Sequence, residues 1–90
     1  MLCVITYDIA NDKRRTKVAD ELENWGRRVQ FSVWECDLEA EQIERLTALL
    51  QEMVSGDDRL RVYRLCQACL DKSVVIGGDG FAIDPDFYQV

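Results

Sequence analysis

A single carboxylate near the N-terminus, Asp8, is the residue best placed to do chemistry in this chain. It follows the apolar run Cys3–Tyr7, so we expect it where a buried first strand emerges at its C-terminal end. Mg²⁺ and other hard divalent cations bind one or two carboxylates and complete their shell with water and phosphate oxygens. A nearby two-fold axis would bring two Asp8 side chains around one ion, which could activate water for phosphodiester cleavage. The plainer alternative, that Asp8 only caps the following helix or its loop, stays open on spacing alone.

Basic side chains gather in two parts of the chain although the net charge is −6. Residues 11–31 hold six basic and four acidic side chains, residues 32–58 hold one and eight, and residues 59–72 hold four and one. Folding could collect the two basic segments into one patch that attracts phosphate. The candidates for contact with nucleic acid are Arg14, Arg15, Lys17, Arg28, Arg59 and Arg61. The alternatives are a solvated helix face for the first segment and ion pairs with the acids of the second helix for the arginines near residue 60.

Two side chains of the middle segment have more than one interpretation. Trp34 could stack on a nucleobase, and a place in the core or in an interface is the alternative. By alternation along a strand, Glu35 shares a face with Val33. It could be a second acid of the site or the partner of an arginine.

The absence of histidine and the spacing of the four cysteines exclude several kinds of site. Without histidine, no Ser–His or Cys–His nucleophile can form. Cys66 and Cys69 make a single C-x-x-C, which falls short of the four ligands of a structural zinc site, so we expect reduced thiols. The segment after the first strand lacks glycine, which disfavours a phosphate-cradling loop of the acylphosphatase kind.

Ninety residues make one small domain, and 48% of them are apolar, which is a high share for a thin core. We therefore expect a homodimer that buries part of this surface. The longest uncharged stretch is too short to span a bilayer and no signal peptide is recognised, so the protein is expected in the cytoplasm and away from membranes.

The elements that position these residues follow from hydrophobic periodicity and breaker residues. We expect strands at 1–9, 28–36, 59–66 and 73–76, a helix from Asn11–Asp12 that Gly26 ends, and a second helix capped by Asp37. This β-α-β-α-β-β order predicts an α+β, ferredoxin-like βαββαβ-type sandwich with two helices on one face of an antiparallel sheet. The domain would span 1–78, and the apolar segment 79–90 would add a strand that could pair with the partner subunit.

Four blocks of the sequence together resemble the CRISPR-associated protein 2 family, the small dimeric partner of the CRISPR integrase in spacer acquisition. They are VITYDI at residues 4–9, KRRTKV at 13–18, GRRVQFSVWE at 26–35 and DRLRVYRLC at 58–66. The blocks occur in the family's order across nearly the whole chain. Each is weak alone, and the set of four is specific.

The resemblance implies a ferredoxin-like homodimer with Asp8 as the metal ligand near its axis. It further implies that Arg15, Lys17, Arg28 and Trp34 occupy the family's conserved basic and aromatic positions, with Tyr7 beside Asp8. Members of the family are described as Mg²⁺-dependent endonucleases on single-stranded RNA or on double-stranded DNA, and the dimer also bridges integrase subunits on DNA. Other functions considered are a DNA-bridging adaptor without catalysis, a virulence-associated toxin endoribonuclease of the same fold, and a small-molecule regulatory domain.

Overall fold

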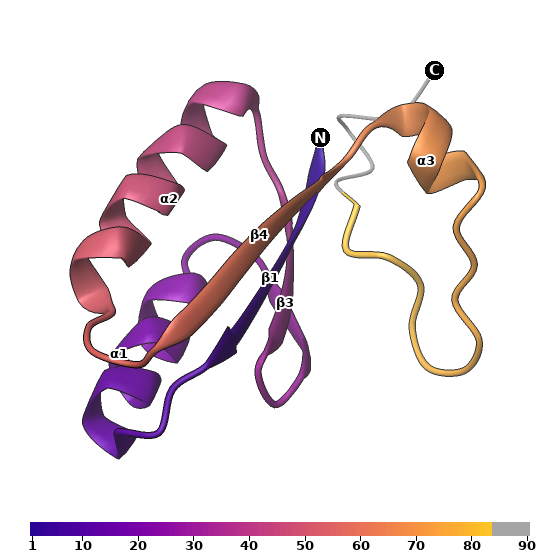
Figure 1. Ribbon diagram of the computed structural model, residues 1–90. Helices are drawn as coiled ribbons and strands as arrows, with labels where there is room; N and C mark the ends of the chain where they lie inside the picture. The colour runs from indigo at the N-terminus through magenta and orange to yellow at the C-terminus, as the bar shows by residue number, and fades with distance from the viewer. Residues whose placement is uncertain (84–90) are drawn as a thin grey trace.

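The computed structural model describes residues 1–83, which form a four-stranded sheet and three helices (Figure 1). The elements in chain order are β1 (Leu2–Asp8), α1 (Asp12–Leu22), β2 (Arg27–Gln30), β3 (Val33–Asp37), α2 (Ala40–Met53), β4 (Arg59–Leu65) and α3 (Gln67–Asp71). No helix within residues 1–83 has both the length and the apolar character needed to cross a bilayer.

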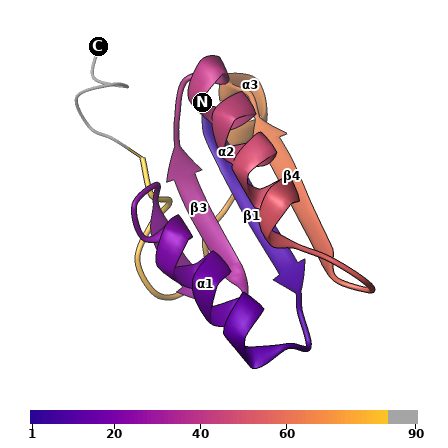
Figure 2. The same ribbon diagram turned by 90° about the vertical axis from the view of Figure 1, so that its left-hand side faces the viewer.

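The sheet order is β2-β3-β1-β4, and every neighbouring pair is antiparallel. With α1 after β1 and α2 after β3, this is the ferredoxin-like βαββαβ arrangement. Both helices lie on one face of the sheet, in front of β3, β1 and β4 in Figure 2. The predicted α+β class and the two helices on one face are thereby confirmed.

The core lies between the sheet and the two long helices because apolar side chains alternate along the strands. Cys3, Ile5 and Tyr7 of the central strand β1 point to this face, and each is at most 6% exposed. The helices contribute the predicted apolar stripes, with Val18, Leu22, Ile43, Leu46 and Leu50 all buried. The other face of the sheet carries Thr6 and Asp8 of β1 and the arginines of β4 that pair with them.

The expected single strand over residues 28–36 is wrong, because this segment is a hairpin of β2 and β3 with its turn at Phe31–Ser32. The two arms carry the same alternation, and the turn contains no glycine, proline, asparagine or aspartate to reveal it. Tertiary packing decides the break. Trp34 and Cys36 are buried against the helices, while all four residues of the edge strand β2 are exposed.

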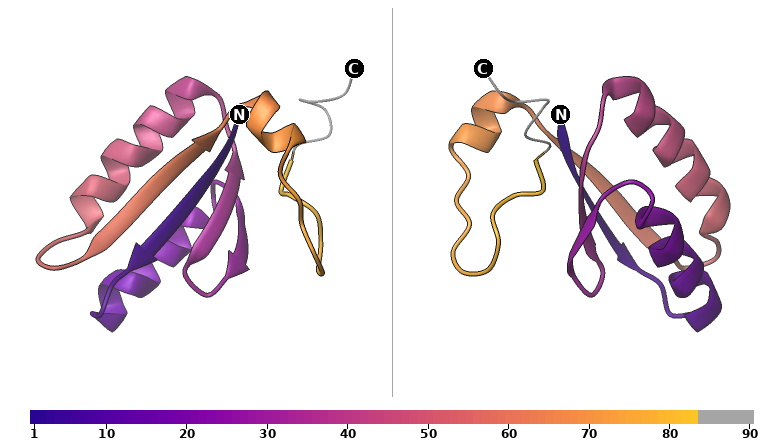
Figure 3. Two further views of the ribbon diagram at one scale, coloured as in Figure 1. Left: turned by 45° about the vertical axis from the view of Figure 1, so that its right-hand side comes forward. Right: turned by 180° about the vertical axis from the view of Figure 1, so that it is seen from behind.

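The segment after β4 also differs from the expectation. Residues 73–76 form no strand, and the short helix α3 comes between them and β4. α3 and the chain that follows it lie on the side of the sheet away from α1 and α2 (Figure 3). Residues 79–83 contain no strand either, and the rest of the predicted C-terminal strand falls on 84–90, outside the described residues.

The predicted cap of the second helix needs a smaller correction. α2 begins after Glu39, whose side chain and that of Gln42 form a capping box, and Asp37 is the last residue of β3. The cap of α1 is as predicted, since Asn11 accepts a hydrogen bond of 2.9 Å from the backbone N–H of Arg14.

Candidate functional site

Asp8 ends β1 on the sheet face that α1 and α2 leave open, and its side chain is exposed. It lies directly across from Arg59 of β4, and Thr6 lies across from Arg61, so these four side chains share one face. With Tyr7 they line a depression of about 240 Å³. No hydrogen bond or ion pair engages the Asp8 carboxylate within residues 1–83. The carboxylate is therefore available to an outside ligand.

The alternative role of Asp8, as a helix cap, is not what the structure contains. Asn11 caps α1, and Asp12 provides the acidic group of its first turn. Two residues, Ile9 and Ala10, separate Asp8 from the cap. The N-terminus of α1 is thus capped without Asp8.

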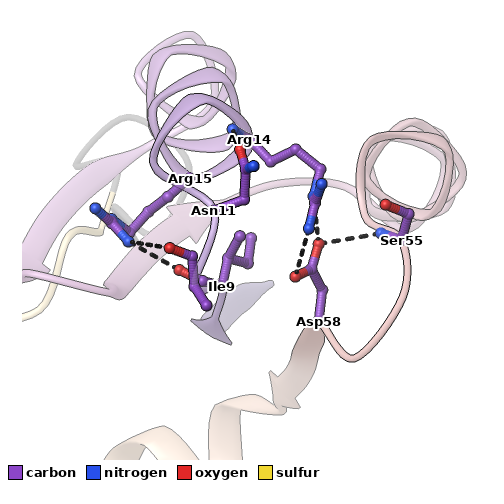
Figure 4. Close-up of polar contacts among 7 residues, drawn as sticks. Ile9, Asn11, Arg14, Arg15, Ser55 and Asp58 are labelled. Carbon is purple, nitrogen blue, oxygen red and sulfur yellow. Dashed lines mark hydrogen bonds and ion pairs between the residues drawn. The ribbon is translucent and has the colours of Figure 1, made fainter.

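Arg15 holds the short connection that follows Asp8 (Figure 4). Its guanidinium donates to the carbonyl oxygens of Ile9 at 2.9 Å and Ala10 at 3.4 Å, and it pairs with the Asp12 carboxylate. A planar guanidinium with several fixed donors suits such a multiple contact. Arg15 therefore orients the backbone next to Asp8 as well as adding positive charge there.

Arg14, its neighbour on α1, points elsewhere and joins two distant elements (Figure 4). Its guanidinium contacts both carboxylate oxygens of Asp58, at 2.8 and 3.3 Å, and Asp58 also accepts a hydrogen bond from the backbone N–H of Ser55. The hydrogen bond from Arg14 is the main reason that the pKa of Asp58 lies below its usual value. This pair fastens α1 to the turn before β4, so the predicted nucleic-acid contact of Arg14 competes with an internal partner.

Tyr7, Arg28 and Trp34 form one cluster at the same end of β1. The Tyr7 hydroxyl accepts hydrogen bonds from the Trp34 indole at 3.2 Å and from the Arg28 guanidinium at 3.4 Å. The Arg28 guanidinium lies 5.1 Å from the centre of the Trp34 ring, which is a cation–π distance. Trp34 is only 2% exposed, so it has the core position that we gave as the alternative to base stacking.

The remaining predicted residues lie on two surfaces. Arg59 and Arg61 flank Asp8, and Arg61 donates a hydrogen bond of 3.0 Å to the Tyr63 hydroxyl. Lys17 is exposed on α1, beside Asp12, Lys13 and Thr16. The structure thus brings Tyr7, Arg15, Arg28 and Trp34 together near the end of β1, whereas Arg14 turns to Asp58 and Lys17 stays on the helix surface.

Glu35 has the arginine partner that was one of its two expected roles. Its carboxylate lies 3.8 Å from the guanidinium of Arg27 and accepts a hydrogen bond of 2.9 Å from the backbone N–H of Ala82. This contact brings the described end of the chain back against β3. Glu35 therefore has a structural role here and is not paired with Asp8.

The cysteines remain free thiols, as expected. Cys3 and Cys36 face each other across β1 and β3, and the hydrogen bond with Cys3, together with burial, raises the pKa of the Cys36 thiol. Cys66 and Cys69 are exposed at the start of α3. Within residues 1–83 no group of three or more histidine, cysteine or acidic side chains could hold a metal ion.

Sequence reasoning missed Phe31, which lies at the turn between β2 and β3 with 69% of its surface exposed. The guanidinium carbons of Arg28 and Arg15 lie 5.5 and 5.8 Å from the centre of its ring. The expected single strand over residues 28–36 placed Phe31 in mid-strand, which hid its position at an exposed turn. An aromatic residue between Gln30 and Ser32 was the only available signal.

Comparison with known proteins agrees with this architecture. Residues 1–73 match the family model described as CRISPR associated protein Cas2. A Chloroflexus aurantiacus protein described as CRISPR-associated endoribonuclease Cas2 1 is 44% identical over 79 residues, covering 86% of this chain and 85% of the relative.

Solved structures give the same result. Streptococcus pyogenes Cas2 superposes with a TM-score of 0.71 at 26% identity, covering 86% of this chain and all (100%) of the other. A chain of a partial Cas6-RT-Cas1–Cas2 complex superposes with a TM-score of 0.73 at 26% identity, covering 87% and 86% of the two chains. With four antiparallel strands in ferredoxin-like order, an exposed aspartate ending the first strand and a family match over most of its length, this chain belongs to the Cas2 family.

Proposed function

We propose that this chain is the Cas2 subunit of a CRISPR spacer-acquisition complex and that its homodimer hydrolyses nucleic acid phosphodiesters with Mg²⁺ or another divalent cation. The observation that carries the proposal is the exposed Asp8 carboxylate, which has no partner within residues 1–83, ends strand β1 and lies beside two arginines of β4. The description of the Chloroflexus relative as an endoribonuclease supports the reaction class.

The donor set at this position fits a hard cation. A carboxylate supplies the oxygen ligand that Mg²⁺ prefers, and few protein ligands are needed when water and phosphate complete the shell. One Asp8 is a single ligand, so the proposal includes a second Asp8 from a second copy of the chain. When bound, the cation would polarise a phosphoryl oxygen and lower the pKa of a water molecule.

The other residues of the depression bind and orient the substrate in this proposal. Arg59 and Arg61 offer guanidinium groups beside Asp8, and guanidinium binds phosphate through paired hydrogen bonds. Their positive charge also offsets the repulsion between the Asp8 carboxylate and a phosphate. Arg15 binds the carbonyl groups of the two residues that follow Asp8. Its role in this proposal is to position Asp8, and it does not contact the reacting atoms.

The experiment compares Mg²⁺-dependent cleavage of RNA and of duplex DNA by the wild type, Asp8→Ala and Asp8→Asn. We expect both variants to lose cleavage and to retain nucleic acid binding, because the arginines remain. Asp20→Asn is the matched control, since Asp20 is an exposed aspartate of α1 away from the depression, and it should cleave like the wild type. Equal cleavage by the wild type and Asp8→Ala would exclude Asp8 from the mechanism.

A second function, a DNA-bridging subunit without catalysis, is favoured by one observation. Asp8 is a single carboxylate in a chain whose described residues hold no metal-binding cluster. This alternative predicts duplex DNA binding that weakens steeply with salt, and no products from any variant at high protein concentration. The similarity to a chain of a Cas1–Cas2 complex supports a Cas1-type partner under either function.

A further inference from the structure

Phe31 is a large aromatic residue that the fold leaves mostly in water. It occupies the turn between β2 and β3, and 69% of its surface is exposed. A large aromatic side chain in water forgoes the stabilisation that burial would bring. A single exposed apolar side chain is nevertheless common on protein surfaces, so the inference depends on what lies around the ring.

Two guanidinium groups adjoin the ring of Phe31. Those of Arg28 and Arg15 lie over the ring, 5.5 and 5.8 Å from its centre, so a ligand would meet the part of the ring that they leave exposed. Both arginines are held in place by other contacts, Arg28 by Tyr7 and Trp34 and Arg15 by the carbonyl of Ile9. The ring is thus framed by fixed positive charges.

The charge of Arg28 has no carboxylate partner in the described part of the chain. Arg15, by contrast, pairs with Asp12. A guanidinium beside aromatic rings and without a counter-charge is a suitable group for phosphate. The surface formed by Phe31, Arg15 and Arg28, which we call the aromatic-basic cluster, therefore offers one stacking surface and one unneutralised cation.

This cluster is connected to both sides of Asp8 through the backbone. The N–H of Tyr7, the residue before Asp8, donates to the carbonyl of Ser32 in the hairpin turn at 3.2 Å. Arg15 binds the carbonyl of Ile9, the residue after Asp8, at 2.9 Å. A nucleotide at the cluster would therefore lie near the end of β1, where Asp8 is located.

We propose that Phe31 is a stacking platform for an unpaired nucleobase and that Arg28 binds the adjoining phosphate, so that the cluster selects single strands or frayed ends. The inference rests on the proposed function, since it requires that the chain bind nucleic acid. Aromatic rings and guanidinium planes are the usual partners of unpaired bases, which present their faces, whereas bases inside a duplex are covered by their neighbours. Phe31 therefore discriminates by strandedness rather than by sequence.

The test measures binding of single-stranded oligonucleotides that contain 2-aminopurine, and of a matched duplex, in EDTA so that no cleavage occurs. Phe31→Leu keeps an apolar side chain without an aromatic face, and it should weaken single-strand binding by about tenfold while leaving duplex binding unchanged. Phe31→Leu should also abolish the quenching of 2-aminopurine fluorescence that accompanies binding. Phe31→Trp should retain both binding and quenching, and Val74→Ala, a change at another exposed apolar residue, should match the wild type.

Several results would overturn the proposal. These are unchanged single-strand binding by Phe31→Leu, an equal loss for single strands and duplex, or a loss by Phe31→Trp as large as that by Phe31→Leu. The RNA and DNA versions of the oligonucleotide should lose affinity by similar factors, because stacking uses the base, and a loss confined to RNA would assign the contact to the ribose hydroxyl instead.

The outcome is separable from that of the proposed function. Phe31-dependent binding of single strands without cleavage by any protein would exclude hydrolysis and leave the stacking platform intact. Cleavage that Asp8→Ala abolishes, in a protein whose single-strand binding is unchanged by Phe31→Leu, would support hydrolysis and exclude the stacking platform.

Discussion

At the scale of single residues, two adjacent arginines of α1 have different roles because they project in different directions. Arg15 turns to the backbone after Asp8, and Arg14 turns to Asp58 before β4. Sequence reasoning grouped them as one basic cluster. The partner of Arg14 comes from a segment 44 residues away in the sequence, whereas Arg15 binds carbonyls five and six residues before it and pairs with Asp12 three residues before it. Local spacing reveals the Asp12 pair but neither the Asp58 partner nor the backbone carbonyls.

The ion pair of Arg14 and Asp58 gives a pH-dependent contribution to stability. Because Arg14 holds the pKa of Asp58 below its usual value, the folded chain binds a proton on Asp58 less readily than the unfolded chain does. The contribution is therefore fully present above the unfolded pKa of about 4 and is lost as pH falls through the lower folded value.

Asp58→Asn should accordingly be less stable than the wild type at pH 7, and the difference should shrink on acidification below about pH 4. Urea unfolding at pH 7 and at several acidic pH values measures it. Asp57→Asn is the matched control, because Asp57 is exposed in the same turn, and it should follow the wild-type curve. A constant difference between wild type and Asp58→Asn at all pH values would contradict the assignment.

At the scale of elements, the β2–β3 hairpin is held close to the end of α1 by a glycine. A Cβ atom on Gly26 would lie 2.2 Å from the Glu35 carbonyl oxygen and 2.5 Å from the Cys36 Sγ. The backbone N–H of Gly26 also donates to the Leu22 carbonyl at the end of α1. Glycine is needed here for the close approach of two backbones. The predicted end of the first helix at Gly26 needs a correction, because α1 ends at Leu22 with Glu23 as its C-cap, and a turn over residues 23–25 comes before Gly26.

Gly26→Ala should therefore lower the free energy of unfolding by about 1–3 kcal/mol, because the backbone of β3 must move to admit the methyl group. Gly80→Ala is the control, since nothing lies within 4 Å of its Cβ position and its effect should be small. Urea unfolding measures both variants. Equal stability of the two would show that β3 yields without cost.

At the scale of the whole molecule, the sheet face opposite α1 and α2 carries the residues from which we propose a dimer. Val4 of β1 lies across from Tyr63 of β4, which is 46% exposed, and the Asp8 depression lies on the same face. Pairing of two copies through this face would remove apolar surface from water and bring the two Asp8 side chains together.

Tyr63→Glu should therefore weaken the homodimer by placing a charge in its interface, while the circular dichroism spectrum stays that of the wild type. Sedimentation equilibrium measures the mass at a series of protein concentrations. Lys13→Glu, a charge change on the exposed surface of α1, is the control and should leave the mass unchanged. A wild type that remains monomeric at high concentration would refute the dimer and the shared Asp8 site together.

The amino-acid sequence by itself predicted the fold class, the two amphipathic helices and the position of Asp8 at the end of the first strand. These follow from local rules: apolar runs form strands, apolar residues at helical spacing form helices, and a carboxylate after a buried strand emerges at its end. The family was also recognisable, because four blocks occur in order along the chain.

Only the tertiary structure decided that residues 28–36 turn back as a hairpin, that Trp34 is buried while Phe31 is exposed, and that Arg14 and Arg15 separate. Two physical reasons account for these outcomes. Alternation has the same period on both arms of a hairpin, and it therefore says which residues share a face without saying what that face meets. Burial and ion pairing depend on segments that are distant in the sequence, and these neighbours are chosen only when the sheet and the helices pack together.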